Sequence, residues 1–298
     1  MSEIKFDGRV AVITGAGAGL GKAYALELAK RGAKVVVNDL GGTRDGSGSD
    51  SKAADLVVDE IKASGGNAVP NYDSVSTMEG GKNIIKTAVD NFGKVDILIN
   101  NAGILRDKSI LKISEQDWDL VVAVHEKGAF CVTQPAFAVM KENKYGRIIN
   151  TTSGSGIYGN FGQTNYAMAK TALLGLMHSV NTEGLKYNIK CNTLAPVAAS
   201  RLTEDVMPPE MFEKLKPEFV APLVVYLVSE TNQDANMIFN AGAGWFSRSA
   251  IVCDPGLVLK DATVESIQEN WKTISDISEA KPLGHVNDTF QFMSAALQ

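Results

Sequence analysis

Three side chains near the middle of the chain, Ser153, Tyr166 and Lys170, are of types that could carry proton transfer. The lysine follows the tyrosine by four residues, and residues 163–183 contain no proline. A helix there would place both side chains on one face, one turn apart. A free phenol titrates at about pH 10, and a neighbouring ammonium favours its phenolate form. The pair could therefore move a proton to or from a substrate oxygen, which the serine hydroxyl would orient.

The spacing of the tyrosine and the lysine also fits an ordinary helix. In that alternative Tyr166 packs along the inner edge of the helix, and Lys170 is solvated. Ser153 lies thirteen residues before the tyrosine and favours the catalytic interpretation only modestly. The choice between the two alternatives therefore depends on the strands and helices that are predicted around these side chains.

The first strand predicted in the chain is followed directly by glycines. Residues 9–14 are rich in β-branched side chains and predict a buried strand. Gly15, Gly19 and Gly21 come next, and Lys22–Lys30 predicts a helix. This order is typical of a dinucleotide-binding βαβ unit, in which glycines let the backbone approach a pyrophosphate at the helix N-terminus. The alternative, a glycine-rich turn without a ligand, is less favoured between a strand and a helix.

An aspartate ends the next predicted strand, Lys34–Asn38. Asp39 lies 24 residues after Gly15, close to the spacing of an acid that bonds the adenosine ribose hydroxyls. A carboxylate there would repel a 2′-phosphate, so it favours NAD over NADP. The alternative is a turn aspartate, because the polar, glycine-rich residues 41–51 follow and predict a surface loop.

Strands and helices alternate along the chain after this point. Strands are predicted near Ala68 and at 95–100, 146–152 and 189–194, and helices at 51–64, 77–91, 114–143 and 163–183. The alternation predicts an α/β fold, a Rossmann-type doubly wound parallel sheet with helices on both faces. We expect the 114–143 helix to bend at Gly128 and Pro135.

Several polar or glycine positions fall where these strands end. Ligands of such sheets bind outside the carboxyl ends of the strands. The convergence of these positions, more than any single motif, predicts a nucleotide and substrate site there. They are Gly15, Asp39, Asp73, Asn101, Ser153 and Pro196.

Composition narrows the class of protein. The 298 residues carry a net charge of −5, which argues against a nucleic-acid partner. The three cysteines lack a C-x-x-C motif and indicate a reduced chain, and the three histidines lack zinc-ligand spacing, so we expect no catalytic metal. The longest apolar run, around 219–228, is too short for a membrane span, and residues 1–5 contain no apolar signal region.

The composition changes after Trp245. Residues 1–244 contain no linker and predict one NAD(P)-binding domain. Residues 245–298 show no further strand alternation and one helix-like segment, 263–275. Because Trp245, Phe246 and Trp271 are large apolar residues that a disordered tail rarely contains, we expect an extension packed on the main domain or on a partner subunit.

Taken together, the motifs resemble those of the short-chain dehydrogenase/reductase family in order and spacing, over most of residues 6–196. They are Thr14-Gly15-x-x-x-Gly19-x-Gly21, Asn100-Asn101-Ala102-Gly103, Ser153 and Tyr166-x-x-x-Lys170. Within the family, further stretches are similar to the (3R)-hydroxyacyl-CoA dehydrogenases of multifunctional peroxisomal enzymes, and this resemblance covers nearly the whole chain. Those stretches are 35–42, 101–107, 158–163, 199–203, 206–208, 242–245 and 270–272.

The resemblance implies a role for each matching residue. Tyr166 would be the catalytic base or acid, Lys170 would lower its pKa and hold the nicotinamide ribose, and Ser153 would bond the substrate oxygen. The NAD site would also include the nucleotide-binding positions of the first half of the chain. They are Gly15, Gly19, Leu20, Gly21, Asp39, Asp73 and Asn101.

The resemblance also implies an activity and a setting. The reaction would be NAD-dependent oxidation of (3R)-3-hydroxyacyl-CoA to 3-oxoacyl-CoA in fatty-acid β-oxidation, by a homodimer in peroxisomes. Because the last three residues are not an S-K-L-type targeting signal, a cytoplasmic location is the alternative. Other candidate functions are a dehydrogenase of steroids or of carrier-protein-linked acyl chains, and a non-catalytic nucleotide-binding module.

Two positions depart from the family pattern. Many members carry an asparagine in a proton relay where this chain has His125, and Pro196 is followed by Val197 where glycine is common. His125 could replace the asparagine in the relay or be a helix histidine satisfied by local hydrogen bonds, and the residues favour neither. An imidazole with an ordinary pKa of about 6.5 would add an acid limb to the pH profile of kcat.

Overall fold

The computed structural model describes residues 3–198 and 214–297. The similar stretches 199–203 and 206–208 therefore lie outside the described residues. The chain forms two compact units, Met1–Arg248 and Ser249–Gln298, which are treated separately.

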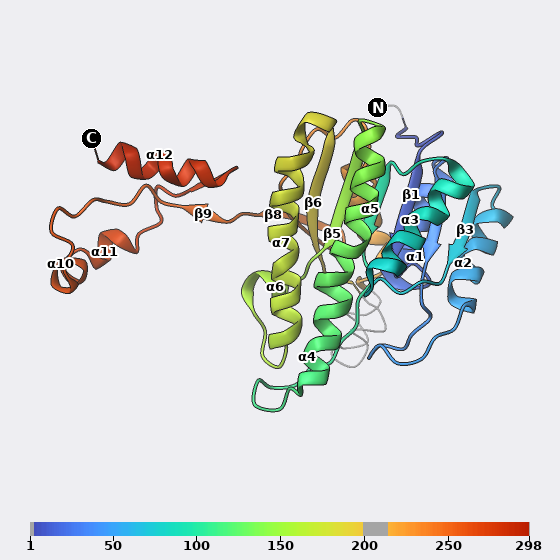
Figure 1. Cartoon of the computed structure of the whole chain (residues 1–298), viewed down its shortest axis with the longest axis horizontal. Helices are drawn as coiled ribbons and strands as arrows, with labels where there is room; N and C mark the ends of the chain where they lie inside the picture. Colours follow the sequence, from blue (N-terminus) through green and yellow to red (C-terminus); the bar gives the residue numbers. More distant parts are fainter. Residues whose placement is uncertain (1–2, 199–213, 298) are drawn as a thin grey trace. The chain divides into compact units, whose positions relative to one another are not determined.

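An eight-stranded sheet forms the centre of the first unit (Figure 1). Its order is β3-β2-β1-β4-β5-β6-β7-β8, and the pairings from β3 to β7 are all parallel. The predicted doubly wound parallel sheet is thus confirmed. The strands are β1 Val10–Thr14, β2 Lys34–Asn38, β3 Asn67–Asn71, β4 Ile97–Asn100, β5 Gly146–Thr151, β6 Ile189–Pro196, β7 Ile238–Gly242 and β8 Trp245–Ser249.

Helices cover both faces of this sheet because its strands are apolar on both sides. In β1, Ala11 and Ile13 pack into one core, and Val10 and Val12 pack into the other. The first core contains residues of α1 Gly19–Lys30, α2 Lys52–Ala63 and α9 Ala221–Leu227. The second contains residues of α3 Met78–Phe92, α5 Gly128–Glu142 and α7 Thr164–Gly184.

The predicted 114–143 helix is not continuous. It consists of α4 Glu115–Val122, a π-helical turn at Ala123–Lys127, and α5. The irregularity lies one turn before Gly128, and Pro135 lies inside α5. Such π turns add a residue to the helix and re-aim the side chains near it. Here the turn contains His125.

The expectation that strands end before residue 245 was wrong, since β8 begins at Trp245 and joins the sheet edge. The second unit has its own small ladder, in which β9 Val252–Cys253 pairs antiparallel with β10 Lys281–Pro282. The 263–275 segment forms α10 Val264–Glu269 and α11 Trp271–Ile274, and α12 Val286–Ala296 was not predicted. Across the described residues, no helix combines the length and apolar character needed to cross a membrane.

Candidate active site

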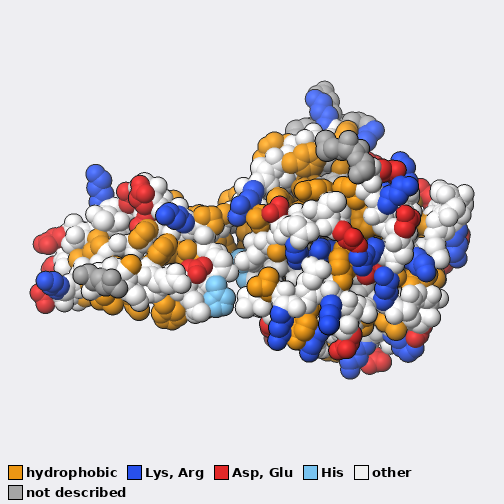
Figure 2. All heavy atoms as spheres, turned by 90° about the horizontal axis from the view of Figure 1, so that it is seen from above, with side chains coloured by type: hydrophobic (Ala, Val, Ile, Leu, Met, Phe, Trp, Pro, Cys, Tyr) orange, Lys and Arg blue, Asp and Glu red, His pale blue; other side chains and the backbone are white. Residues whose placement is uncertain are grey.

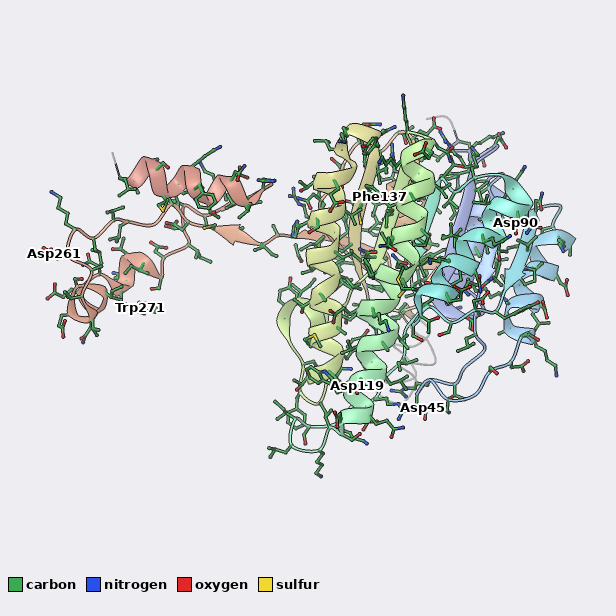
Figure 3. The ribbon with its side chains drawn as sticks, in the orientation of Figure 1. Asp45, Asp90, Asp119, Phe137, Asp261 and Trp271 are labelled. Atoms are coloured by element: carbon green, nitrogen blue, oxygen red, sulfur yellow. The ribbon has the colours of Figure 1, made fainter. Side chains whose placement is uncertain are left out.

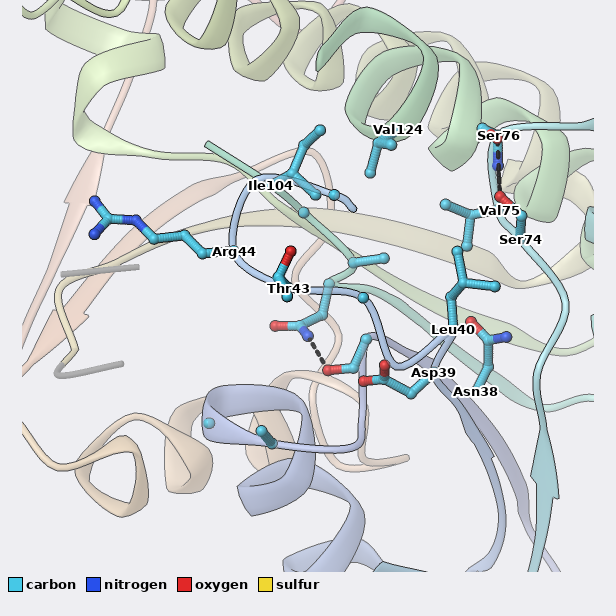
Figure 4. Close-up of a pocket in the computed structure, with 18 of the residues that line it drawn as sticks. Asn38, Asp39, Leu40, Thr43, Arg44, Ser74, Val75, Ser76, Ile104 and Val124 are labelled. Atoms are coloured by element: carbon cyan, nitrogen blue, oxygen red, sulfur yellow. Dashed lines mark hydrogen bonds between the residues drawn. The ribbon is translucent and has the colours of Figure 1, made fainter. Parts of the chain in front are cut away.

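A cleft opens at the carboxyl ends of β1 to β4, where most of the predicted nucleotide-binding residues meet. Gly15, Gly19, Leu20, Asp39, Asp73 and Asn101 all line it. Figure 4 shows the side chains of Leu40, Val75 and Val124 among those that line the cleft. Gly21 does not line the cleft and lies behind the glycine loop, so its part in binding would be indirect.

Glycine is required at two positions of the loop. Gly15 has a φ of +64°, and a Cβ there would lie 2.8 Å from the Cα of Ala102. A Cβ at Gly21 would lie 2.3 Å from the carbonyl oxygen of Gly15. The amide of Asn101 fixes the same turn, because its Nδ2 donates to the carbonyl oxygens of Thr14 and Gly15 at 3.0 Å each.

The first helix presents its N-terminus to this cleft. Ala18, the N-cap of α1, forms no side-chain cap, so the first backbone N–H groups of the helix are available to an anion. A loop in which glycine alternates with alanine beside such a helix end fits a pyrophosphate. The residues present are therefore compatible with a dinucleotide.

Asp39 is held at the mouth of the cleft. Its Oδ2 accepts the Gly17 N–H at 2.8 Å, and its Oδ1 accepts the Gly41 N–H at 2.7 Å. Asp39 was interpreted from the sequence either as a ribose-binding acid or as a turn aspartate. The two interpretations are compatible, because Asp39 both organises the turn and lines the cleft. Asp73, at the end of β3, has its carboxylate fixed by the amides of Asn71 and Asn83.

The structure brings Ser153, Tyr166 and Lys170 together. Ser153 follows β5 as the N-cap of α6 Gly154–Tyr158, where its Oγ accepts the Ser155 N–H, and it lies near enough to the Tyr166 phenol to act on the pKa of that phenol. The Lys170 Nζ lies 5.6 Å from the centre of the Tyr166 ring. It also donates to the carbonyl oxygen of Thr151 at 2.6 Å, which ties α7 to the end of β5. The predicted face of the helix is confirmed, and Lys170 is buried, not solvated.

Burial shifts both ionisable groups toward their neutral forms. It raises the pKa of Tyr166 to about 12, while the nearby Ser153 side chain acts in the opposite direction. It lowers the pKa of Lys170 to about 7. We expected the ammonium to lower the pKa of the phenol, and the opposite direction prevails because desolvation is the larger effect. Tyr166 is therefore a phenol at neutral pH, suited to donate a proton, and must be deprotonated before it can act as a base.

His125 lies against this group, with only 3% of its surface exposed. Its ring meets the Tyr166 ring edge-on at 5.2 Å between centroids. Its Nε2 lies 3.0 Å from the Ile104 nitrogen and 2.8 Å from the Ile104 oxygen. Its buried Nδ1 has no hydrogen-bond partner among residues 3–198 and 214–297. The close packing requires Gly103, where a Cβ would lie 2.5 Å from the His125 Cε1.

The expectation that His125 titrates in the working range was wrong. Burial, and then the nearby Lys170 charge, lower the pKa of His125 well below its ordinary value. The imidazole is therefore neutral at neutral pH, and it gives no acid limb. A neutral ring has one donor and one acceptor, so its Nδ1 can still bond a water or substrate atom.

Sequence reasoning missed a group of polar residues that surround the start of α7. Asn165 is fully buried, and its Oδ1 accepts the Tyr166 N–H at 2.8 Å. Its Nδ2 donates to the main-chain oxygens of Arg106 and Asp117. The only signal for Asn165 is its position next to Tyr166. Arg106 and Asp117 belong to other elements, and no spacing along the chain relates them to the helix.

Comparison with known proteins agrees with this geometry. The family model described as "short chain dehydrogenase" matches residues 9–207. Peroxisomal multifunctional enzyme A of Dictyostelium discoideum is 55% identical, over 91% of this chain and 61% of its own length. The full-length peroxisomal multifunctional enzyme type 2 of Drosophila melanogaster is 44% identical with a TM-score of 0.84, over 99% of this chain and 50% of that one. The chain thus spans only half to three fifths of these relatives.

A further solved structure is similar over a smaller share. A 7α-hydroxysteroid dehydrogenase complexed with NADH and 7-oxo glycochenodeoxycholic acid is 29% identical with a TM-score of 0.72, over 80% of this chain and 95% of that one. The family match covers well over half of the chain and includes the glycine loop, Ser153, Tyr166 and Lys170. The chain belongs to the short-chain dehydrogenase family, and it is a dehydrogenase of the type that uses a nicotinamide dinucleotide.

Proposed function

We propose that the protein oxidises (3R)-3-hydroxyacyl-CoA to 3-oxoacyl-CoA with NAD, as a step of fatty-acid β-oxidation. The observation that carries the proposal is the Ser153–Tyr166–Lys170 group beside the dinucleotide cleft, in a chain more than half identical to a peroxisomal multifunctional enzyme. By the same similarity we propose a peroxisomal location and a homodimer.

In this proposal Tyr166 and Ser153 act on the substrate oxygen, and Lys170 and His125 support them. Tyr166 accepts the hydroxyl proton of the substrate in oxidation and returns it in reduction, and Ser153 donates a hydrogen bond to the same oxygen. The bound NAD supplies the hydride acceptor. Lys170 fixes the position of Tyr166 from the end of β5 and bonds the nicotinamide ribose. His125 holds the segment at Ile104 through Nε2 and offers its Nδ1 to a water of the proton relay.

We propose NAD in preference to NADP because of Asp39. Its carboxylate is held in the cleft by two backbone N–H groups, where it can accept bonds from ribose hydroxyls. A 2′-phosphate at the same place would meet a fixed negative charge. Gly15, Gly19, Leu20, Asp73 and Asn101 would line the remaining length of the cofactor, and Gly21 would support the loop from behind.

We also propose that residues 1–244 carry the dehydrogenase chemistry, and that 245–298 form an extension packed on this domain or on a partner subunit. Each proposed catalytic residue lies in the first of the two compact units. The extension would then affect assembly or substrate access, not the proton and hydride transfers.

The test is an NADH-formation assay with 3-hydroxyacyl-CoA substrates of several chain lengths in both stereochemical forms. We expect activity with the (3R) series and at least about a hundredfold less with the (3S) series, because Tyr166 and the cofactor fix one face of the substrate. Preference for a hydroxysteroid or a carrier-protein-linked acyl chain would contradict the substrate proposal. Absence of turnover with any alcohol despite NAD binding would favour a nucleotide-binding module.

A further inference from the structure

A loop that follows β2 covers part of the nucleotide cleft. Gly42, Thr43, Arg44 and Gly46 line the cleft, and Ile104, which also lines it, lies next to Gly46. Figure 4 shows Thr43 and Arg44 on this loop, which curves close to Ile104. We call residues 41–50 the cleft loop; a ligand in the cleft would contact both the cleft loop and the segment at Ile104.

The cleft loop needs bonds to hold it closed. It contains four glycines, Gly41, Gly42, Gly46 and Gly48, and three of these have a positive φ. Glycine loses more conformational freedom on ordering than any other residue, so a closed loop of this composition is costly without partners. Within the loop, the Asp45 carboxylate accepts hydrogen bonds from the Thr43 and Ser47 hydroxyls.

Two bonds join the middle of the cleft loop to neighbouring residues of the segment after β4. The Leu105 N–H donates to the Arg44 carbonyl oxygen at 3.0 Å. The Arg106 Nε donates to the Asp45 carbonyl oxygen at 2.9 Å. Figure 3 shows Asp45 on this loop, on the same unit as Asp119 of α4. The segment that begins at Ile104 thus lines the cleft beside the loop and also holds the loop in place.

Arg106 binds a second element through its Nη1. Its Nη1 lies 3.0 Å from Asp117 Oδ1 on α4, and the Lys108 Nζ lies 2.7 Å from Asp117 Oδ2. Asp117 is only 4% exposed, and its pKa is held well below the usual range by Lys108, Ser114 and Arg106. The carboxylate is thus a permanent buried charge, which keeps the planar guanidinium in one orientation.

The same residue reaches the catalytic helix through Asn165. The Asn165 Nδ2 donates to the Arg106 carbonyl oxygen at 3.2 Å, and its Oδ1 accepts the Tyr166 N–H at 2.8 Å. A continuous series of bonds therefore runs from the cleft loop through Arg106 to the residue before Tyr166. The loop, α4 and α7 have Arg106 as a common partner.

We propose that Arg106 is a positioning residue that couples closure of the cleft loop over the dinucleotide to the placement of Tyr166. This inference rests on the proposed binding of NAD in the cleft. A ligand that touches both the cleft loop and Ile104 stabilises the closed loop, and by reciprocity the Arg106 bonds strengthen binding of that ligand. Arg106 contacts neither the substrate oxygen nor the hydride.

The test compares Arg106→Met with Lys108→Met. Both remove a cation from Asp117, but only Arg106 also bonds the cleft loop, so Lys108→Met is the matched control. Two quantities are measured for each variant and the wild type. They are NAD affinity by calorimetry and amide hydrogen exchange of residues 41–50 without cofactor.

We expect Arg106→Met to weaken NAD binding by about tenfold, the lower end of what a charge-assisted hydrogen bond contributes. Exchange of the cleft loop should be faster. The bond from Asn165 to the main-chain oxygen of Arg106 survives the substitution, so kcat at saturating NAD should fall only about twofold, through loss of the side-chain bond to Asp117, whose main-chain oxygen also accepts from Asn165. Lys108→Met should leave all three near wild type. Arg106→Lys, whose single ammonium cannot bond both partners, should fall between them.

Two results would overturn the proposal. One is equal loop exchange and NAD affinity, within twofold, in Arg106→Met and wild type. The other is an equal loss in Lys108→Met, which would reduce the role of Arg106 to neutralising Asp117. Wild type that binds no NAD would instead contradict the proposed function, while the exchange measurement would still decide whether Arg106 holds the loop. If Arg106→Met does not fold, Arg106→Lys serves for both measurements.

Discussion

The two compact units differ in where their apolar side chains lie. In the first unit the sheet strands are buried on both faces, and residues such as Ile13, Leu98 and Met177 are inaccessible to solvent. In the second unit no residue from 249 to 297 is buried, and Val286, Phe290 and Trp271 are more than half exposed. Figure 2 shows hydrophobic side chains on the surfaces of both units, and Figure 3 shows Trp271 on the second.

The difference follows from size and from secondary structure. A segment of about fifty residues is only marginally stable as an independent domain, because it buries a small fraction of its surface. Its short helices and two-residue strands cannot enclose a core, whereas a twisted sheet with two helix layers can. The first unit can therefore fix side chains for chemistry, whereas we propose that the second gains stability from a surface outside itself. The predictions below test whether the first unit carries the chemistry and whether the second depends on a surface outside itself.

The largest effect should come from the catalytic phenol of the first unit. Tyr166→Phe keeps the ring that packs on His125 and removes the group that transfers the proton. We expect kcat to fall by about 10²–10⁴ with little change in NAD affinity, as measured by steady-state kinetics and calorimetry. Near-normal turnover of this variant would mean that the chemistry lies elsewhere.

The pH dependence should differ between the two directions of the reaction. Because burial raises the pKa of Tyr166 to about 12, the phenol is protonated at neutral pH. Oxidation needs the phenolate, so its kcat should rise with pH from 6 to 9, by at most about tenfold per unit. Reduction needs the phenol and should lack this rise. Identical profiles in both directions would contradict the assignment of Tyr166.

The role of His125 can be tested by two substitutions. Each places a side-chain amide group where one of the two ring nitrogens lies. Glutamine can replace Nε2 at Ile104, and asparagine can replace Nδ1, the buried nitrogen without a partner in the part of the chain that the structure describes. If His125 is part of the relay, His125→Asn should keep activity and His125→Gln should lose about tenfold or more in kcat. The reverse order would show that the role is to hold Ile104. Unchanged kcat in both variants would make it a packing residue.

Asp39→Ala should change the choice of cofactor more than the rate. It removes the charge that opposes a 2′-phosphate and the acceptor for ribose hydroxyls. We expect NAD to bind about tenfold more weakly and NADP relatively better, measured as the ratio of kcat/KM for the two cofactors. Glu60→Ala, at an exposed position of α2, is the control. Wild type that already prefers NADP would contradict this role.

The smallest effect on chemistry should come from the second unit. We expect residues 249–297 of the native protein to resist proteolysis, because their apolar side chains are covered by the first unit or by a partner subunit. Trp271→Ser should abolish this resistance, and Lys272→Ser should not. Protection that increases with protein concentration would indicate a partner subunit. Rapid trimming near residue 248 of the wild type, with activity and oligomeric state unchanged, would contradict the proposal.

Elements with a strong local pattern could be predicted from the sequence. The β-branched runs of β1 and β2, the glycine loop and the Tyr166–Lys170 spacing are all encoded within a few neighbouring residues. The site residues they contain were found in the same way. Together they predicted the sheet type and the place of the cleft.

What the sequence did not reveal depends on contacts between distant elements. The π turn at Ala123–Lys127 differs from an α-helix by one residue and has no composition of its own. The bonds of Arg106 lead to Asp45, Asp117 and Asn165, which lie 61, 11 and 59 positions away along the chain. The pKa of Tyr166 depends on burial, which a spacing of four residues does not reveal.

The contact between Gly103 and His125 has a consequence for how this site can change over time. A side chain at position 103 would collide with the imidazole, so replacement of the glycine is tolerated only after position 125 has become smaller. The two positions therefore form a pair in which the order of substitutions is fixed. Gly103→Ala should be deleterious in this chain and milder in a His125→Asn background. A set of related sequences should record that dependence as covariation of the two columns.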